Sequence, residues 1–457
     1  MLRNFVMAIV VAASVGSVAA TNYYMSPSGS DDADGLTEAT AKASLGVAQK
    51  LLRPGDTLYI LPGLYCPTDA DIALREEPGP YAVVYNLSMC GEPGRPITIA
   101  GVTGADGRRP LFDLSRVAPE GCRVTGFLIS GRRLVLANFE VRGIRVTRTD
   151  HTQSENIRIS GGAWNTLENI ACHDGMGIGF YINKASHHNL VLNCDGYNNY
   201  DPVSDIDRRT GMGSGGNNDG FGCHVKGGMP GNMFVGCRAW NNTDDGFDLI
   251  NCYSPVTFEY SLALSNGYDA EGVRRADGNG FKAGGFSMKP RKVALEGGKA
   301  PRHTVIHNVA IGNKANGLYA NHHLGGIDFM HNSAIDNGNY NYSMVNRRGA
   351  SATDNVDVDG YDHMVTGNSS VSARGRHTTW FGSTCKVDGN SWQMQGEPSA
   401  SYNREALVAP RGSDGMLPAA TLNEIASLRH SDKCGADFGE YVRAVAEARA
   451  ESGAHAR

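Results

Sequence analysis

A short pattern recurs through the middle of the chain: a small residue, an apolar residue, any residue and then asparagine. Five fragments end with it: Cys194–Asn199, Cys237–Asn242, Ser261–Asn266, Asn308–Asn313 and Asn332–Asn337. Successive fragments start 43, 24, 47 and 24 residues apart. We take 24 residues as one turn of a coil. The longer spacings then correspond to two turns, or to one turn that carries an inserted loop.

This repeat predicts an all-β fold, a right-handed parallel β-helix. Each fragment reads as a short strand followed by Asn, which tolerates left-handed backbone angles and hydrogen-bonds its own turn. Asn residues at one position of successive coils would stack as a ladder, each side-chain amide pairing with the next. A period far above the roughly 18 residues of a left-handed hexapeptide helix argues against that fold, and a propeller would show hairpin signals. Glycine, at 58 of 457 residues, suits many short strands and turns.

The chain divides into three segments. Residues 1–20 carry Arg3, an apolar run and the small-residue end Val18-Ala19-Ala20, the pattern of a secretory signal peptide. Residues 21–400 are expected to form the β-helix, with an amphipathic capping helix at about 37–52 that covers its open end. Residues 401–457 are expected to be irregular and to end in a polar tail that docks weakly or is mobile.

The composition excludes some partners. The formal charge is −5, and it becomes −6 once Arg3 is removed with the signal peptide. A mildly acidic chain lacks the basic patches that nucleic-acid binding requires. No segment after residue 20 resembles a membrane span, so we expect an exported protein without a membrane partner. We also expect no nucleic-acid partner, and a monomer.

Ten cysteines in an exported chain suggest disulfides. Cys172, Cys194 and Cys237 fall at one repeat position and are interpreted as a stack of buried thiols. The better disulfide candidates lie in irregular regions, and their pairing stays open: Cys66, Cys90, Cys122, Cys385 and Cys434.

A second frame follows the ladder Asn: Asp or Asn, then Gly, then Phe or Leu, then a variable residue. It occurs at Asp219–Gly222, Asp245–Asp248, Asn279–Lys282 and Asn316–Tyr319. In a solenoid, equivalent positions stack about 4.8 Å apart. The frame therefore gathers four carboxylates on the outer face, those of Asp219, Asp244, Asp245 and Asp248.

An oxygen-only cage of this kind suits a hard cation. Calcium accepts six to eight oxygen ligands in irregular geometry, whereas magnesium prefers fewer carboxylates and transition metals prefer His or Cys. The sequence thus predicts a Ca²⁺ site. The alternative is that these Asp residues cap turns.

Lys282 stands one coil from Asp248 in this register. A nearby dication and partial burial would both lower the pKa of its amine and make it a Brønsted base. In a plain ion pair with Asp248 the pKa would rise instead. The sequence leaves both alternatives open.

Several stretches closely resemble the polysaccharide lyases of family 9, and the likeness covers most of the chain: NNDGFGCH, GNMFVGCRAWNNTDDGFDLI, DGNGFKAGG and NSAIDNGNYNY. The resemblance implies a right-handed β-helix with an Asn ladder and a secreted, calcium-dependent enzyme. It implies that the four aspartates hold the ion, that Lys282 is the catalytic base, and that an acidic plant cell-wall polymer is cleaved by β-elimination. Polygalacturonate is the expected substrate.

Two alternatives stay open. One is the same reaction on rhamnogalacturonan I, and the other is a non-catalytic β-helical carbohydrate-binding protein. Insertions at 200–218 and 267–278 depart from the family, so they leave the substrate undecided.

Candidate substrate-binding residues lie in and near the insertions. Arg208 and Arg209 are in the first insertion, and Arg274 and Arg275 are in the second. A guanidinium binds a uronate carboxylate through two hydrogen bonds. His224 and Asn321 lie near the same groove in this register. For each arginine the alternative is a solvated loop side chain.

Overall fold

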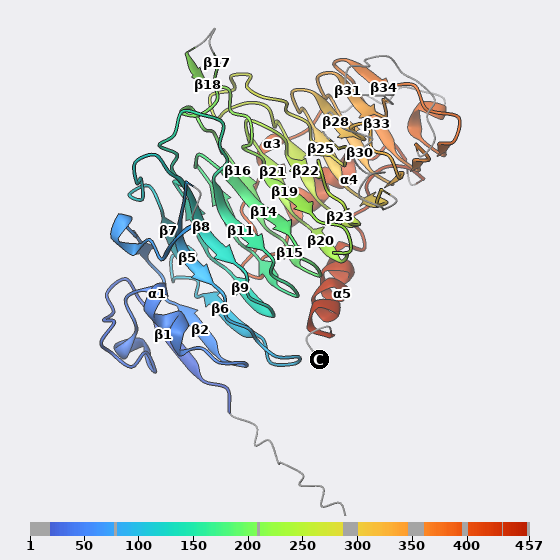
Figure 1. The fold of residues 1–457 in the computed structure, drawn as a ribbon. Helices are drawn as coiled ribbons and strands as arrows, with labels where there is room; N and C mark the ends of the chain where they lie inside the picture. The colour runs from blue at the N-terminus through green and yellow to red at the C-terminus, as the bar shows by residue number, and fades with distance from the viewer. Residues whose placement is uncertain are drawn as a thin grey trace, which may run out of the picture.

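The computed structural model describes residues 19–76, 80–207, 211–286, 300–345, 361–394, 401–431 and 433–454. The chain winds as a parallel β-helix whose coils contribute strands to three long sheets (Figure 1). Each sheet grows by parallel pairing of a strand with its equivalent in the next coil, apart from one antiparallel edge strand at Leu74–Glu76. The predicted right-handed parallel β-helix is confirmed.

The first sheet has twelve described strands. They are β1 (Asn22–Met25), β2 (Thr57–Ile60), β6 (Ile97–Gly101), β9 (Leu134–Ala137), β12 (Thr166–Glu168), β15 (Leu190–Leu192), β20 (Asn232–Val235), β23 (Val256–Glu259), β26 (His303–Ile306), β29 (Ile327–Met330), β32 (Met364–Thr366) and β35 (Lys386–Asp388).

The second sheet has ten described strands. They are β3 (Leu64–Tyr65), β7 (Leu111–Asp113), β10 (Glu140–Arg142), β13 (Ala171–His173), β16 (Asp195–Tyr197), β21 (Arg238–Trp240), β24 (Leu262–Leu264), β27 (Val309–Ile311), β30 (Ser333–Ile335) and β33 (Ser369–Val371).

The third sheet has eleven described strands and carries the candidate site. They are β4 (Leu74–Glu76), β5 (Tyr81–Leu87), β8 (Arg123–Ile129), β11 (Glu155–Ser160), β14 (Ile178–Lys184), β19 (Phe221–Val225), β22 (Phe247–Asp248), β25 (Phe281–Lys282), β28 (Asn316–Tyr319), β31 (Tyr340–Ser343) and β34 (Arg376–Thr378). A separate hairpin consists of β17 (Ile206–Asp207) and β18 (Met212–Gly213).

Direct pairing of neighbouring coils explains the longer spacings of the repeat. β16 pairs with β21, and β24 pairs with β27, with no coil between them. The spacings of 43 and 47 residues are therefore single turns that carry inserted loops. Two of these loops reach the candidate site.

The predicted Asn ladder is present and buried. The Nδ2 group of each Asn donates to the Oδ1 atom of the next at 2.9 to 3.0 Å, in the order Asn199, Asn242, Asn266, Asn313 and Asn337. The same pattern continues from Asn337 to Asn341. These bonds satisfy the polar groups of turns that no water reaches.

Two further ladders escaped the sequence analysis. One joins Asn165, Asn189 and Asn232. The other joins Asn308, Asn332, Asn368 and Asn390. The first lies at the starts of first-sheet strands, and the second lies two residues after the ends of first-sheet strands.

The aromatic residue of the second frame fills the core under the third sheet. Phe180, Phe221, Phe247 and Phe281 stack with ring centroids 4.6 to 4.9 Å apart. The glycine before each of the last three is needed because a side chain would have no room. A Cβ atom on Gly246 would lie 2.6 Å from the Gly280 carbonyl oxygen.

The predicted capping helix at 37–52 is broken into short pieces. The structure has 3₁₀ turns at Glu38–Thr40 and Gln49–Leu51, and helix α1 at Leu45–Ala48. Ser44 caps α1 and accepts a hydrogen bond from the Val47 amide, so a new helical start interrupts the segment. The segment still packs on the end of the solenoid, since Leu45 and Ala48 are fully buried in the core.

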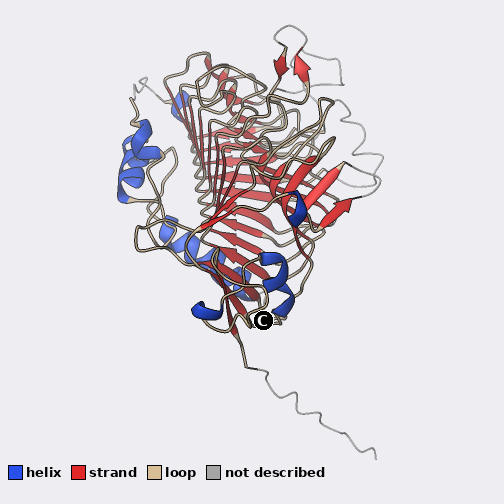
Figure 2. Cartoon of the chain, turned by 90° about the vertical axis from the view of Figure 1, so that its left-hand side faces the viewer, coloured by secondary structure: helices blue, strands red, loops and turns tan. Residues whose placement is uncertain are grey.

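The C-terminal segment packs firmly, which corrects the expectation of a weakly docked tail. It forms α3 (Arg404–Leu407), α4 (Ala419–Ser427) and α5 (Tyr441–Ala454). Two further 3₁₀ turns lie outside this segment, at Asp69–Asp71 and Ser391–Gln393. The helices lie on the outside of the stacked strands (Figures 1 and 2). Tyr441 is fully buried, and its hydroxyl donates to Asn193 Oδ1 at 2.7 Å.

An ion-pair triad anchors the same segment. Arg411 and Arg238 both contact the buried Asp195 carboxylate, at 2.7 and 2.8 Å. The two guanidinium groups outweigh burial and hold the pKa of Asp195 well below its usual range. The polar composition of the tail conceals an apolar contact face that includes Leu417, Ile425 and Val445.

The cysteine predictions are partly wrong. All ten cysteines lie in described residues and no disulfide joins any of them, so the expected disulfides are not formed. Cys194 and Cys237 occupy equivalent positions, because the residues that follow them, Asp195 and Arg238, pair with each other. Cys172 does not share this position, since it pairs with Gly196, two residues after Cys194. Cys172, Cys194 and Cys237 are nevertheless all buried, as predicted.

No helix among the described residues is long and apolar enough to cross a membrane.

Removing one ladder member should destabilise the fold strongly. In Asn266→Ala, buried groups on Asn242, Asn313 and Ala239 lose partners. Each such group costs about 1–3 kcal/mol, so we expect a loss of about 3 kcal/mol or more in urea unfolding. The control Asn423→Ala, at an exposed position of α4, should change little; equal effects in the two variants would contradict the ladder's role.

Three buried histidines should make the fold sensitive to acid. His303, His323 and His363 accept backbone N–H groups at Nδ1, at 3.0 to 3.2 Å. Burial lowers the pKa of His323 to about 4 and that of His363 to about 3. Both lie below the value of about 6.5 for an unfolded chain. The contribution of these histidines to the free energy of unfolding is therefore complete above about pH 6.5 and is lost as the pH falls toward 3.

Urea unfolding at pH 7.5 and pH 5.0 measures this loss. His363→Asn keeps an acceptor for the Ile327 N–H but cannot titrate, so the difference between the two pH values should shrink. An unchanged difference would rule out His363 as a source of the acid sensitivity.

Candidate active site

Four stacked strands of the third sheet position the candidate site. Asp248 in β22 pairs with Gly222 in β19 and with Lys282 in β25, and Lys282 pairs with Tyr319 in β28. The predicted column is confirmed. Lys282 therefore follows Asp248 on the next coil, as the register required.

The residues at the first position of the frame also stack as predicted, and hydrogen bonds join them along the column: Asp219, Asp245, Asn279 and Asn316. The Asp245 amide donates to Asp219 Oδ1 at 3.0 Å. Asn279 Nδ2 donates to Asp245 Oδ1 at 2.8 Å, and Asn316 Nδ2 donates to Asn279 Oδ1 at 2.7 Å. These bonds fix the orientation of the two carboxylates.

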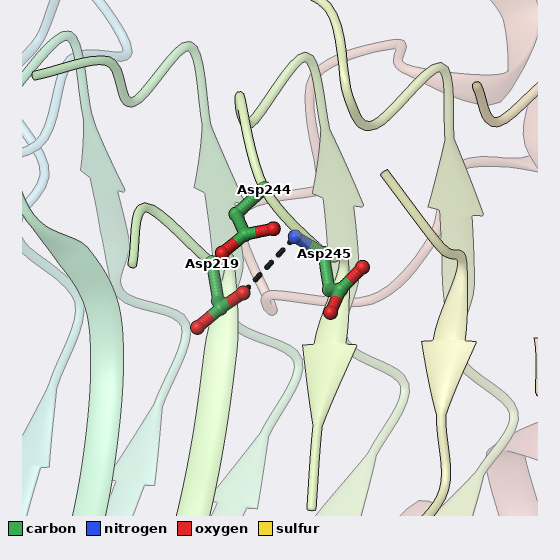
Figure 3. Close-up of side chains that lie close together, drawn as sticks. All are labelled: Asp219, Asp244 and Asp245. Atoms are coloured by element: carbon green, nitrogen blue, oxygen red, sulfur yellow. Dashed lines mark hydrogen bonds between the residues drawn. The ribbon is translucent and has the colours of Figure 1, made fainter. Parts of the chain in front are cut away.

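Three of the four predicted metal ligands form one cluster. Asp219, Asp244 and Asp245 each offer an oxygen, and these oxygens all lie within 4.8 Å of one another. Figure 3 shows the three side chains grouped on neighbouring coils. Asp219 and Asp245 are buried, so their charges lie close together with little water between them.

The two insertions hold Asp244 in this cluster. The Asn217 amide donates to Asp244 Oδ2 at 2.8 Å, and the Asp277 amide donates to Asp244 Oδ1 at 3.1 Å. Asn217 belongs to the first insertion and Asp277 to the second. The two inserted loops thus orient a residue of the candidate site.

The cluster is electrostatically costly as it stands. Burial, reinforced by the neighbouring carboxylates, raises the pKa values of Asp219 and Asp245 well above the usual range, and burial raises that of Asp244 to about 6. Asp245 Oδ2 is buried and receives no well-directed hydrogen bond, although Lys282 Nζ lies 3.0 Å away. A divalent cation would remove this cost. The oxygen donors fit calcium, and no Cys or His belongs to the cluster.

Asp248 lies beside this cluster, between Lys282 and His224. Its Oδ2 atom is 3.3 Å from Lys282 Nζ and 3.9 Å from His224 Nε2. Its Oδ1 atom accepts the Ile250 amide at 2.7 Å. The predicted fourth ligand is therefore in the site but is turned toward the lysine.

Lys282 is buried and surrounded by carboxylates. Nζ lies 3.0 Å from Asp245 Oδ2, 3.3 Å from Asp248 Oδ2 and 3.7 Å from Asp277 Oδ2. Burial is the largest single influence and lowers the pKa of Lys282, but the carboxylates together outweigh it and raise the pKa well above the usual value. Without a cation, this is the ion pair that the sequence analysis gave as the alternative.

The predicted substrate residues have different surroundings. Arg208 and Arg209 lie outside the described residues. Arg275 pairs with Asp269 of its own insertion at 2.7 Å, and its guanidinium lies 4.6 Å from the ring of Tyr200 in the first insertion, so it links the two insertions. Arg274 is exposed.

His224 and Asn321 lie in or close to the site. His224 Nδ1 is 3.1 Å from the Tyr181 hydroxyl, and its buried Nε2 atom, on the side of Asp248, has no hydrogen-bond partner. Asn321 Nδ2 donates to the Gly284 carbonyl at 2.8 Å, just after β25.

Three site residues were missed by the sequence analysis. Tyr181 precedes Gly222 in the same column, so the register could have placed it beside His224. Asp277 lies two residues before the Asn279 frame, and an acidic residue next to that frame was an available signal. Lys314 follows the ladder residue Asn313, and no sequence pattern marked it.

The fold and this geometry together define a class: a right-handed parallel β-helix that carries an acidic, calcium-type cluster beside a buried lysine on one sheet. Residues 23–355 match the family described as "Pel9A-like, right handed beta helix region". The chain belongs to this family, polysaccharide lyase family 9.

Individual relatives agree with this assignment. The chain is 31% identical over 408 residues to pectate lyase L of Dickeya dadantii, covering 88% of this chain and 82% of the relative. A solved rhamnogalacturonan lyase is 38% identical with a TM-score of 0.79, covering 93% of this chain and 98% of the other. The crystal structure of pectate lyase Pel9A is 29% identical with a TM-score of 0.65, covering 88% of both chains.

Calcium should stabilise the protein through this cluster. A ligand that binds only the folded state adds about 2.7 kcal/mol at 100 times its dissociation constant, which raises the unfolding temperature. Asp219→Asn should lose most of that gain. In metal-free buffer it should unfold no earlier than the wild type, because one repelling carboxylate is gone.

The exposed Asp388→Asn is the matched control and should keep the calcium response. Differential scanning calorimetry with calcium and with a chelator measures both variants. A full calcium gain in Asp219→Asn would exclude the cluster as the binding site.

Proposed function

We propose that the protein cleaves an acidic pectic polysaccharide by β-elimination at a galacturonate unit, with Lys282 as the base and calcium as the cofactor. One observation carries the proposal: the Lys282 amine lies 3.0 and 3.3 Å from Asp245 and Asp248, beside a three-carboxylate cluster suited to calcium. Asp219, Asp244 and Asp245 would hold the ion, with Asp248 as the fourth ligand. Family membership supports the reaction class.

The reaction removes a proton from C5, the carbon next to the uronate carboxylate. In the proposal, the neutral amine of Lys282 takes this proton. The electron pair then forms the C4–C5 double bond as the bond from C4 to the glycosidic oxygen breaks, and the leaving sugar recovers a proton at that oxygen. The products are a shortened chain and an unsaturated uronide.

The C5 proton is weakly acidic because the carboxylate is already charged. A bound calcium ion would offset the charge that develops next to C5 and would weaken the hold of the carboxylates on the Lys282 proton. The chain's own part is to keep Lys282 in place through Asp245 and Asp248.

Two other reaction schemes fit the site less well. Hydrolysis needs a paired acid and base on either side of the glycosidic oxygen, whereas these carboxylates cluster on one side with an amine. A non-catalytic binding protein could use the ladder and the cation site but has no need for a buried Lys282 between them.

Two pectic backbones are candidates as substrate. Polygalacturonate is the substrate predicted from the sequence, and pectate lyases are among the relatives. Rhamnogalacturonan I is favoured by the greater similarity of this chain to the solved rhamnogalacturonan lyase than to Pel9A, 38% against 29% identity. Both place a uronate carboxylate at the site, and the leaving sugar differs.

Ultraviolet absorbance of the unsaturated product decides between these substrates. The protein is incubated with each polymer in calcium and, separately, in chelator. Product from only one polymer identifies the substrate. Absence of product from both polymers would favour the carbohydrate-binding alternative.

Export is also part of the proposal. The secretory pattern of residues 1–20 and the extracellular nature of the polymer both support it. Amino-terminal sequencing of the protein from the culture medium should start at Thr21.

Lys282→Ala should remove most of the activity. Loss of a general base typically costs about 10²- to 10⁴-fold in rate. The exposed Lys50→Ala, at the N-terminal end of the solenoid, should retain the wild-type rate. Circular dichroism in calcium confirms that both variants are folded, and a folded Lys282→Ala variant with wild-type kcat would refute the base assignment.

A further inference from the structure

We propose that Lys314 is a positioning residue for the cation site: its ammonium group holds the second insertion so that the Asp277 amide orients Asp244. The inference rests on the proposed function, since it assigns a task in building the same site. Among the described residues, Lys314 makes no hydrogen bond or ion pair with the three clustered carboxylates, and its charge acts on Asp244 and Asp245 only at longer range.

The first step is the contact between Lys314 and the insertion. Lys314 Nζ donates to the carbonyl oxygens of Arg275 at 3.1 Å, of Ala276, and of Asp277 at 3.5 Å. Three successive carbonyls thus converge on one amine. An ammonium has three donors on a compact head, which suits this convergence.

The second step is the anchoring of Lys314 itself. Its amide donates to the Asn266 carbonyl at 2.9 Å, and the next amide, of Ala315, donates to Gly278 at 2.8 Å. These two bonds hold both ends of the insertion. Glycine is required at each end, because a Cβ atom on Gly267 or Gly278 would lie 2.5 or 2.8 Å from the Lys314 Cβ atom.

The third step leads from the insertion to the cation site. The Ala276 amide donates to the Thr243 carbonyl at 3.0 Å, directly before Asp244. The Asp277 amide donates to Asp244 Oδ1 at 3.1 Å, and the Asp277 carboxylate lies 3.7 Å from Lys282 Nζ. Two of the three carbonyls that Lys314 holds therefore belong to residues whose amides bond Thr243 and Asp244, namely Ala276 and Asp277.

The aliphatic chain of Lys314 (the stem) and its ammonium group (the head) have separate roles. The stem packs over the two glycines, which an apolar side chain of equal length also does. The head supplies the three hydrogen bonds. Lys314→Met removes the head and keeps the stem, and Lys314→Gln keeps N–H donors without the charge.

Calcium binding by isothermal titration calorimetry, on the full-length exported protein, tests the inference without relying on activity. Loss of a partner that orients a metal ligand typically weakens metal affinity about 10- to 100-fold. We expect the calcium dissociation constant of Lys314→Met to rise about 10-fold, with a smaller rise for Lys314→Gln. The exposed Lys386→Met should bind as the wild type does.

A second readout separates positioning from general stability. Lyase activity of Lys314→Met should require more calcium and should recover as calcium is raised. A purely structural role would lower the unfolding temperature and leave the calcium affinity unchanged. Should Lys314→Met fail to fold, Lys314→Gln carries the same comparison.

The outcomes also separate this inference from the function it rests on. Wild-type affinity in both Lys314 variants, with the wild type binding calcium and releasing unsaturated product, would overturn the inference alone. A wild type that does not bind calcium would overturn both.

Discussion

In-register stacking of successive coils is the interaction on which the rest of the structure depends. Each coil places its Asn, Gly, Phe and outer polar residue over those of the coil before it. The Asn ladder and the phenylalanine stack fix this register from inside the solenoid. Hydrogen bonds between the Asn side chains measure 2.9 to 3.0 Å, and the ring centroids lie 4.6 to 4.9 Å apart. A slip of one residue would turn the outer side chains inward. The position of Lys282 beside Asp248 is therefore a consequence of core packing.

The site is built from two kinds of parts. The stacked strands contribute Asp219, Asp245, Asp248 and Lys282, whose positions follow the repeat. The insertions contribute backbone amides to Asp244, which precedes the strand and is not fixed by the ladder. The residues on the strands and the surroundings set by the loops can therefore change independently of each other.

Much of this arrangement follows from the sequence because solenoid geometry is simple: equal positions in successive coils lie one strand spacing apart. That rule places Asn266 on Asn313 and Asp248 beside Lys282. The rule does not predict side-chain orientations or contacts that are independent of the register. Asp248 turned toward Lys282, the Lys314 amine reaching three carbonyls, and α5 docking through Tyr441 all depend on contacts between segments far apart in the chain. Similarly, the prediction for Cys172 was wrong because Cys172 lies two positions later in its coil than Cys194 does in the next coil.

The charge balance links the fold to the proposed chemistry. Three clustered carboxylates and a buried amine are mutually dependent: the carboxylates hold the Lys282 proton tightly unless a cation takes over part of their charge. A crystal structure of the protein grown with calcium tests this account most directly. We predict one ion at the roughly 2.3–2.6 Å typical of calcium from oxygens of Asp219, Asp244, Asp245 and Asp248, with Lys282 still in the adjacent coil. An ion bound away from these residues, or Lys282 displaced from the cluster, would contradict the account.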